Sequence, residues 1–449
     1  MPDNTTLTKS VKEFFAYDPD KDQWSDEPVP EEERMGVWGP TSVWIGFAIA
    51  YIVAFIGAQI YFGLGMPDAI YAIVLGNLIL VVYSGALAYA AAEGGLNFPL
   101  QVKEAFGSLG ALIPIAIMGL LVNGWYAYQA WLAADVIRAA WSPPWLLLAV
   151  GITVLYGIPS IIGIEALEEV VTKLVIPLML IAGIYMLVVK VLPAGASILN
   201  KPAPGEQIPF MVGVGLAWGT FAVSGTATGD IVRFASSTRN AIIATVVAFL
   251  ICNTGMMVLG ALVAATLPEL SLYFGMIGLL ASIPLVIVAF VSCFSTCDAC
   301  HYGATMSYTN LHEKITWRTA AVGAMLISVI AVVSGIISNL LGYLILIGIV
   351  VPPIGAIILS EFFIVRKYQS FDIVRKERLN IPAIISLILA IGLNYYVYNN
   401  IPVIPTGLAG LLLAFILYPV LDWMRASISG EDSVRQHLEG QADPIPDDD

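Results

Sequence analysis

The chain has 449 residues, of which 58% are apolar and only 12% are charged, about half of the charged share in an average soluble domain. Its net charge is −13, and most of that excess lies in the polar segments 1–38 and 425–449. Apolar runs recur between Thr41 and Met424, and each is long enough to cross a bilayer. Composition therefore excludes a soluble single domain and predicts an all-α polytopic membrane protein with acidic tails.

Hydropathy and helix breakers divide the chain into about twelve apolar spans joined by short connections. Each span is expected to be an α-helix, because lipid offers no hydrogen-bond partner to an open backbone group. A ten-helix core is expected over 39–365, a basic loop over 366–379 and two accessory helices over 380–424. The spans are expected at 39–64, 67–92, 109–139, 144–163, 171–193, 207–228, 238–266, 276–308, 315–333, 336–365, 380–398 and 401–424.

The basic residues predict the orientation of these spans. If the first span begins in the cytoplasm, all but three of the twenty Lys and Arg residues lie on the cytoplasmic side, the exceptions being Arg138, Lys190 and Lys201. Both tails then face the cytoplasm of a multi-pass cell-membrane protein. Their enrichment in Pro, Asp and Glu predicts solvated, disordered ends.

Two spans contain unusual numbers of glycines. In the sixth span, five glycines fall between Gly213 and Asp230, which weakens the continuity of a helix. The first span also contains glycines, Gly46 and Gly57 among them, but there close packing between helices is the preferred interpretation. The first and sixth spans would correspond in a five-plus-five inverted repeat. Interrupted helices at corresponding positions mark a binding site near the middle of the membrane.

In the third span, Trp125 and Gln129 are four residues apart, so they share one face of the helix. A flat heterocycle could stack on the indole ring and form hydrogen bonds with the amide in its plane. Two alternatives remain open at this point. Trp125 could be a packing residue, and Gln129 could join neighbouring helices through hydrogen bonds.

The eighth span contains adjacent hydroxyls, Ser295 and Thr296, and the carboxyl group of Asp298. Oxygen ligands suit a hard cation such as Na⁺, although Ser and Thr hydroxyls in helices also bond to the carbonyl four residues earlier. A buried carboxyl group in a membrane predicts a functional or networked role. Asp230 and Arg233, at the cytoplasmic end of the sixth span, are interpreted as a gate or a structural ion pair.

Taken together, four motifs resemble the nucleobase–cation symporter-1 family, which includes cytosine permeases and hydantoin transporters. The resemblance covers residues 35–425 and implies the fold of the bacterial leucine transporter, an inverted ten-helix repeat with two extra helices. The motifs are Gly124-Trp125, Asp230-Ile-Val-Arg233-Phe234, Ser295-Thr-Cys-Asp298 and Pro352-Pro-Ile-Gly355.

The resemblance implies a ligand held between two aromatic rings, Trp125 of the third span and Phe221 at the break in the sixth. Thr220 matches the neighbouring backbone contact, and Gln129 and His301 match polar contacts of the hydantoin branch.

The cytosine branch has an Asn where this chain has Cys297, and a Ser where it has Val223. Both departures argue against cytosine as the preferred ligand.

For a cation, the resemblance implies carbonyl ligands from Gly46, Ile49 and Ser292 beside the hydroxyls of Ser295 and Thr296. No cofactor is expected apart from a bound Na⁺, and no nucleic acid partner is expected.

These observations predict a secondary active transporter that imports a nucleobase or related small heterocycle by symport with Na⁺ or H⁺ through alternating access. Candidate substrates include cytosine, purines, hydantoin or allantoin, and thiamine-precursor pyrimidines. A membrane-embedded enzyme and a channel without coupled transport are the alternatives. The sequence contains no zincin, nucleophile-elbow or phosphate-loop motif and no filter-like loop.

Overall fold

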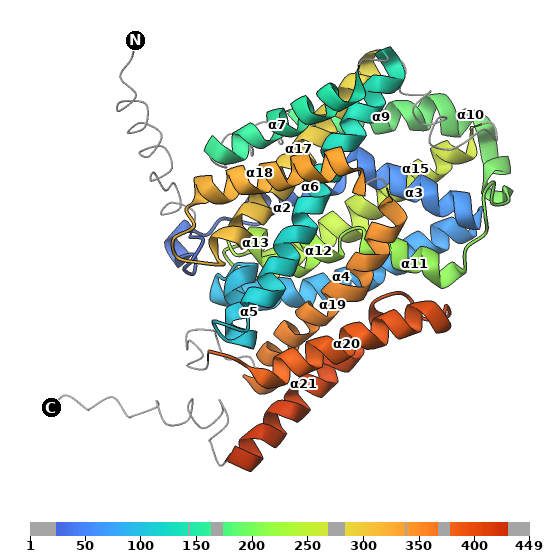
Figure 1. The fold of residues 1–449 in the computed structure, drawn as a ribbon. Helices are drawn as coiled ribbons and strands as arrows, with labels where there is room; N and C mark the ends of the chain where they lie inside the picture. Colours follow the sequence, from blue (N-terminus) through green and yellow to red (C-terminus); the bar gives the residue numbers. More distant parts are fainter. Residues whose placement is uncertain are drawn as a thin grey trace, which may run out of the picture.

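The protein, described here by a computed structural model, is a bundle of long helices (Figure 1). The described residues are 24–141, 144–162, 174–267, 283–336, 339–366 and 378–429. Within them the only strand-like pairing is an isolated bridge between Met35 and Ala235. The outer parts of both tails, 1–23 and 430–449, and the basic stretch 367–377 lie outside the described residues.

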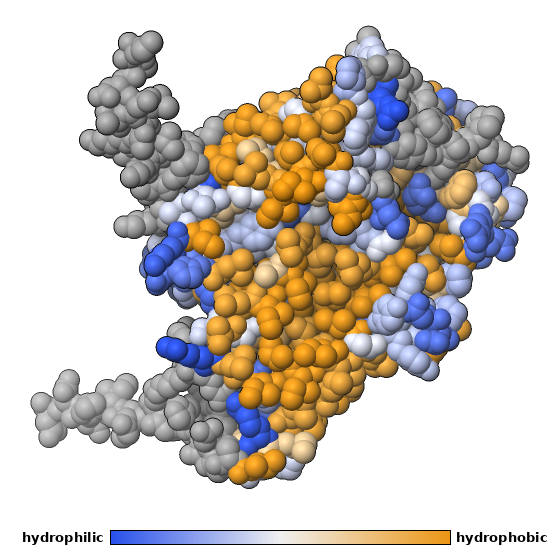
Figure 2. All heavy atoms as spheres, viewed as in Figure 1, coloured by the Kyte–Doolittle hydropathy of each residue, from blue (hydrophilic) through white to orange (hydrophobic). Residues whose placement is uncertain are grey.

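Twelve spans follow one another along the described chain, as expected. Nine helical runs are long and apolar enough to cross a membrane, the bent pair α2–α3 makes a tenth, and the shorter apolar helices α7 and α11 belong to the remaining two. On the face shown in Figure 2, apolar side chains form a broad area across the middle of the bundle, with hydrophilic patches toward its ends. The elements are α2 (Trp38–Ala48) with α3 (Tyr51–Leu64), α4 (Asp68–Gly94), α5 (Phe98–Phe106), α6 (Leu112–Trp141), α7 (Trp145–Ile162), α9 (Ile176–Met186) continuing through η4 (Leu187–Val191), α10 (Leu192–Ala194) and η5 (Gly195–Asn200), α11 (Phe210–Gly219) with α12 (Ala222–Thr226) and α13 (Gly229–Val232), α14 (Thr238–Val246) continuing through η6 (Val247–Asn253) and α15 (Thr254–Ala265), α17 (Ile283–Thr309), α18 (Trp317–Ser334), α19 (Leu340–Ser360) with η8 (Glu361–Val365), α20 (Ile381–Asn400) and α21 (Leu408–Ser429).

The contacts between helices have the symmetry of the expected inverted repeat. The first span packs on the seventh through α3 and α15, and its counterpart, the sixth span, packs on the second through α11 and α4. The third span packs on the eighth (α6 with α17), and the fourth packs on the ninth (α7 with α18). Exchanging the two halves leaves this set of pairs unchanged.

Glycines allow the first and seventh spans to cross at backbone contact. A Cβ on Gly57 of α3 would collide with the carbonyl group of Met257, and one on Gly260 of α15 would collide with that of Ala54. Close approach of this kind is the usual role of small residues between membrane helices. The packing interpretation is therefore right for Gly57.

The first span is nevertheless broken, so the preference for glycine packing alone was wrong for this span. Helix α2 ends at Ala48, Ala50 is extended with φ −72° and ψ 151°, and α3 leaves at an angle of 49°. The break falls at Ile49 and Ala50, neither of which is a helix breaker by residue type. In the sixth span the expected break is present, with Thr220 and Phe221 between α11 and α12.

Helix α5, which follows the second span, was not expected. It is amphipathic and short, and its N-terminus is capped by Asn97, whose side chain accepts from the N–H of Leu100 at 2.9 Å. Pro99 in the first turn and Gly107 after the last residue complete ordinary start and stop signals. A search for long apolar runs overlooks a helix of this kind.

The expectation of a disordered tail is wrong for residues 24–37. The N–H of Val29 bonds to the carbonyl of Gly95 at 2.9 Å, and the carbonyl of Ser25 accepts from the side chain of Asn97 at 2.6 Å. Arg34 donates to the carbonyl of Ala92 at 3.1 Å. The acidic composition of this segment carries no signal of these backbone partners.

We expect Gly57→Ala to lower the unfolding midpoint in detergent, with a destabilisation of about 1–3 kcal/mol from overpacking, because the new methyl group meets the backbone of Met257. Gly85→Ala in α4 is the matched control, since a Cβ there meets no described atom within 4 Å. It should be neutral or stabilising through helix propensity. Equal midpoints for the two variants would contradict the close crossing.

Candidate functional site

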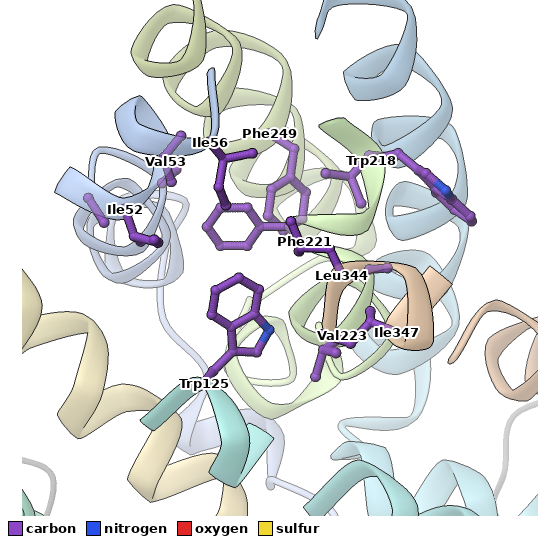
Figure 3. Packing of buried hydrophobic residues seen from close by; sticks show 14 of the residues in the cluster. Ile52, Val53, Ile56, Trp125, Trp218, Phe221, Val223, Phe249, Leu344 and Ile347 are labelled. Atoms are coloured by element: carbon purple, nitrogen blue, oxygen red, sulfur yellow. The ribbon is translucent and has the colours of Figure 1, made fainter. Parts of the chain in front are cut away.

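The two predicted aromatic rings lie opposite one another at the centre of the bundle. The indole of Trp125, from α6, projects toward the phenyl ring of Phe221 at the break between α11 and α12 (Figure 3). Both side chains are 6% exposed. Phe249 packs behind Phe221 with ring centroids 5.2 Å apart. The broken span thus presents one ring and the continuous third span presents the other.

Gln129 lies one turn after Trp125 on α6 and is 1% exposed. Neither its side-chain nitrogen nor its side-chain oxygen has a hydrogen-bond partner among the described residues. A buried amide in this condition costs free energy unless something else satisfies it. The side chain therefore offers one acceptor and two donor hydrogens to a ligand. The alternative role in joining helices finds no partner in the described chain.

Thr220 stands next to Phe221 at the break, and its hydroxyl donates to the carbonyl of Leu216 at 2.9 Å. Its side chain is thus occupied within α11. The backbone at the break leaves helical geometry at Phe221, where φ is −118° and ψ 15°. The N–H of Thr220 also donates to the Leu216 carbonyl, at 3.2 Å, so the backbone group that Thr220 could present to a ligand is its carbonyl. Its contact with a ligand stays a prediction.

Helix α19 covers the aromatic pair from one side. The ring of Tyr343 meets Trp125 edge-on at 5.5 Å between centroids, and its hydroxyl donates to the carbonyl of Leu121. Gly124, in the predicted Gly-Trp motif, makes room for this ring, because a Cβ there would lie 2.7 Å from the Tyr343 hydroxyl. Leu344 and Ile347 continue the wall beside Phe221 (Figure 3).

His301 and Cys297 lie in the packed interface between α17 and its neighbours. The His301 ring stacks on Tyr126 at 4.7 Å, and its Nε2 is 2.7 Å from the carbonyl oxygen of Ala321 in α18. The Cys297 thiol donates to the carbonyl of Tyr126 at 3.5 Å. Both partners are protein groups, so the described contacts of these two residues belong to helix packing. Their direct contact with a ligand stays a prediction.

One of the predicted cation ligands, Ser292, lies where α17 meets the break in the first span. The hydroxyl of Ser292 accepts from the N–H of Tyr51, the first residue of α3, at 2.8 Å. Gly46 and Ile49 lie in and directly after the last turn of α2, where helix carbonyls have no intrahelical partner.

The two predicted hydroxyl ligands, Ser295 and Thr296, are buried on the same helix as Ser292. The Thr296 hydroxyl donates to the Ser292 carbonyl at 3.1 Å, which is the backbone bonding expected of Thr in a helix. Ser295 is 3% exposed. Hydroxyl and carbonyl oxygens are the ligands that a monovalent hard cation prefers. The joint binding of a cation by these residues stays a prediction.

Asp298 is buried in the scaffold rather than at the break. Its carboxylate accepts from the hydroxyl of Ser160 in α7, and the same hydroxyl lies 3.1 Å from the Asp298 carbonyl oxygen. The indole of Trp317 in α18 donates to the Ser160 carbonyl at 2.8 Å. The Asp298 carboxylate is therefore part of a hydrogen-bond network, as expected, and this network joins α7, α17 and α18.

Asp230 and Arg233 each have a partner of their own. Asp230 accepts from the N–H of Phe98 at 2.8 Å and so caps the first turn of α5, a favourable place for a carboxylate. Arg233 donates to the carbonyl of Trp24, and its guanidinium lies 4.8 Å from the centroid of the Phe234 ring. The predicted pair therefore ties the end of the sixth span to α5 and to the N-terminal segment.

Sequence reasoning missed Tyr343 and Phe249, which support the two rings from behind. A single aromatic residue in an apolar helix has no pattern that separates a role beside the ligand from ordinary packing. For Tyr343, the available signal was the small residue at Gly124, which leaves room for a large neighbour.

Comparisons with known proteins agree with this geometry. Residues 28–405 match a family model described as permease for cytosine/purines, uracil, thiamine and allantoin. The chain is 28% identical to the cytosine permease of Escherichia coli strain K12 over 402 residues, which cover 89% of this chain and 95% of that permease. The chain belongs to this permease family.

Solved structures share the fold. The inward-facing conformation of Mhp1 aligns with a TM-score of 0.77 at 19% identity, covering 93% of this chain and 97% of Mhp1. Mhp1 is a nucleobase-cation-symport-1 family transporter, and its closed form with bromovinylhydantoin bound aligns with a TM-score of 0.74 at 20% identity over 90% of this chain and 96% of that one. The predicted family and fold are therefore confirmed, and the chain is a permease and not an enzyme.

In the ligand-free protein, we expect Gln129→Leu to raise the unfolding midpoint, with a stabilisation of about 1 kcal/mol, because an apolar side chain of similar size removes two unpartnered polar atoms. The matched control is Asn77→Leu in α4, whose amide donates to the Ile73 carbonyl at 2.9 Å and which should destabilise. Thermal unfolding in detergent measures both. A lower midpoint for Gln129→Leu would show that the amide is satisfied within the protein.

Proposed function

We propose that this permease imports a nucleobase or closely related heterocycle by cation symport, and that the ligand lies between Trp125 and Phe221 with its edge bonded to Gln129. The observation that carries the proposal is the unpartnered amide of Gln129, buried one turn from an aromatic ring that faces a second ring. The two faces of a flat heterocycle could stack on the two aromatic rings. The donors and acceptors along its edge could form hydrogen bonds with the Gln129 amide.

The amide of Gln129 restricts the ligand's chemistry only in part. An amide can turn over, so it pairs with a carbonyl beside an N–H, as in uracil, hydantoins and oxopurines, and also with the amine edge of cytosine. Discrimination must come from the neighbouring positions Val223 and Cys297. Valine offers no hydrogen bond, and the thiol is a weak donor already directed at Tyr126. We therefore place lactam-type rings ahead of cytosine.

The proposed cation site is the oxygen cluster between α17 and the break of the first span, formed by the hydroxyls of Ser295 and Thr296 and the carbonyls of Gly46, Ile49 and Ser292. Its composition favours Na⁺ over a proton, because it contains hydroxyl and carbonyl oxygens and no carboxylate. A cation there would join α17 to the first span in one state of the transport cycle. This gives alternating access a physical link to ion binding.

The orientation is part of the proposal. Both termini face the cytoplasm of the cell membrane, because that arrangement places all but three of the basic residues on the cytoplasmic side.

Stacking is tested by Trp125→Ala and Phe221→Ala, each expected to weaken binding by about 1–3 kcal/mol, the scale of base–aromatic stacking. The parent protein is first screened by thermal shift against uracil, hydantoin, allantoin, purines and cytosine. Affinities for the ligand that ranks first are then measured by calorimetry. Trp423→Ala is the control, because its side chain is 68% exposed on α21. Parent-like affinity in both ring variants, or cytosine ranking first, would contradict the proposed ligand site.

Coupling is tested by measuring heterocycle affinity in sodium and in choline buffers. We expect Na⁺ to tighten heterocycle binding and the heterocycle to tighten Na⁺ binding by the same factor, because linkage is reciprocal. Ser295→Ala should bring this factor close to one. Ser307→Ala is the control on the same helix, since its hydroxyl bonds to the Gly303 carbonyl at 3.0 Å. Equal affinities in the two buffers would exclude Na⁺ at this site and favour a proton-coupled mechanism through Asp298.

A further inference from the structure

Two consecutive prolines interrupt the hydrogen bonding of α19. Pro352 and Pro353 lie inside the helix and are both buried. Proline has no N–H to donate, so the carbonyls four residues earlier, at Gly348 and Ile349, lose their helical partners. In a membrane interior a carbonyl in this position needs a partner from elsewhere in the protein.

The accessory helices supply that partner through Asn394, a residue of α20 that is 1% exposed. Its side-chain nitrogen donates to the carbonyl of Ile349 at 2.9 Å, and its side-chain oxygen accepts from the N–H of Gly410 in α21 at 2.6 Å. One amide thus joins the proline region of α19 to both helices of the accessory pair, which pack along α19 (Figure 1).

The segment between α20 and α21 approaches the second freed carbonyl. Gly407 has φ +96°, and a Cβ at this position would collide with the carbonyl of Gly348, so only glycine fits. The neighbouring carbonyl, that of Thr406, accepts from the indole N–H of Trp218 at 2.8 Å. Trp218 lies three residues before Phe221, and the same segment therefore contacts both the broken sixth span and the prolines of α19.

The part of α19 before the prolines forms the wall beside the aromatic pair. Tyr343 meets Trp125 there, and Leu344 and Ile347 lie beside Phe221 (Figure 3). With two helical hydrogen bonds missing, the backbone of α19 constrains its own direction less at that point. The direction of this wall therefore depends on how firmly the proline region is held.

We propose that Asn394 is a positioning residue that holds the proline region of α19 through the Ile349 carbonyl, so that the accessory helices set how tightly the ligand is enclosed. The first part concerns the protein alone, and the second part rests on the proposed ligand site. The accessory pair is then a working part of the permease beyond its ten-helix core.

The first experiment follows amide hydrogen exchange in residues 340–351 of the purified full-length protein, which requires no ligand. Asn394→Leu should speed exchange there by about tenfold, the scale of one lost buried hydrogen bond. In a Pro353→Ala background residue 353 can donate to Ile349 itself, so Asn394→Leu should then have little further effect. In a Pro352→Ala background the full effect should remain, because that proline frees the Gly348 carbonyl instead.

The second experiment measures affinity and dissociation rate for the best ligand of the screen. Asn394→Leu should weaken binding by about tenfold, mainly through faster dissociation. Asn399→Leu is the matched control on the same helix, because its exposed amide donates to the Tyr395 carbonyl of its own helix at 2.7 Å. It should leave both the exchange and the affinity unchanged.

Unchanged exchange in Asn394→Leu, or an equal increase with and without Pro353, would overturn the proposal. Faster exchange with parent-like ligand affinity, while Trp125→Ala still weakens binding, would overturn the enclosure role. If no heterocycle binds the parent protein, the proposed function fails, and the exchange cycle by itself still decides whether Asn394 holds α19.

Discussion

The structure depends on one constraint, which is that every backbone group inside a membrane needs a partner from the protein. A continuous helix meets this requirement by itself. Three of the places where this chain departs from regular helical bonding lie in the first, sixth and tenth spans, and in the first and tenth the described partner is a side chain of another span. The hydroxyl of Ser292 accepts from Tyr51 at the first break, and the amide of Asn394 donates to Ile349 beside the prolines. At these two points a buried polar side chain is thus placed where backbone bonding stops.

The same constraint explains why the ligand site is recognisable. Most buried amides of the interior have partners, as Asn77 and Asn394 show. Gln129 is different, because neither of its polar atoms has a partner in the described chain. In the proposed site, a heterocycle that satisfies this amide would also stack on the ring of Trp125, one turn away. Helix α6, which packs on α17, carries Trp125 on one side of the candidate site. The broken sixth span carries Phe221 on the opposite side.

The parts of the fold that could be predicted from sequence were those with a compositional signal. Hydropathy located the spans, and the glycines from Gly213 onward indicated the break in the sixth. The break at Ile49 and Ala50 has no such signal, because apolar residues there are equally suited to a continuous helix. The last span was expected from residue 401 and begins at Leu408. Its apolar first residues instead form the segment that carries Thr406 to Trp218, a tertiary contact that hydropathy does not encode.

In the candidate site, too, some features could be predicted from the sequence and others depend on tertiary contacts. Trp125 and Gln129 could be paired from their spacing, because four residues make one helical turn. Which face of α17 carries His301 and which carries Ser295 depends on the rotation of that helix against α6 and α2, and small residues in an apolar helix do not determine this. In the structure His301 stacks on Tyr126 and bonds to Ala321.

Overall similarity to a cytosine permease likewise does not determine which side chains meet a ligand. The 28% identity is an average over 402 residues of the bundle, whereas the choice among heterocycles depends on the few side chains that meet the edge of the ring. In the proposed site, Val223 and Cys297 would offer that edge little hydrogen bonding, because valine has no polar side-chain atom and the Cys297 thiol is directed at the Tyr126 carbonyl. We therefore expect the proposed site to suit a ring whose edge is satisfied by Gln129 and the backbone at Thr220 better than one that needs further polar side chains.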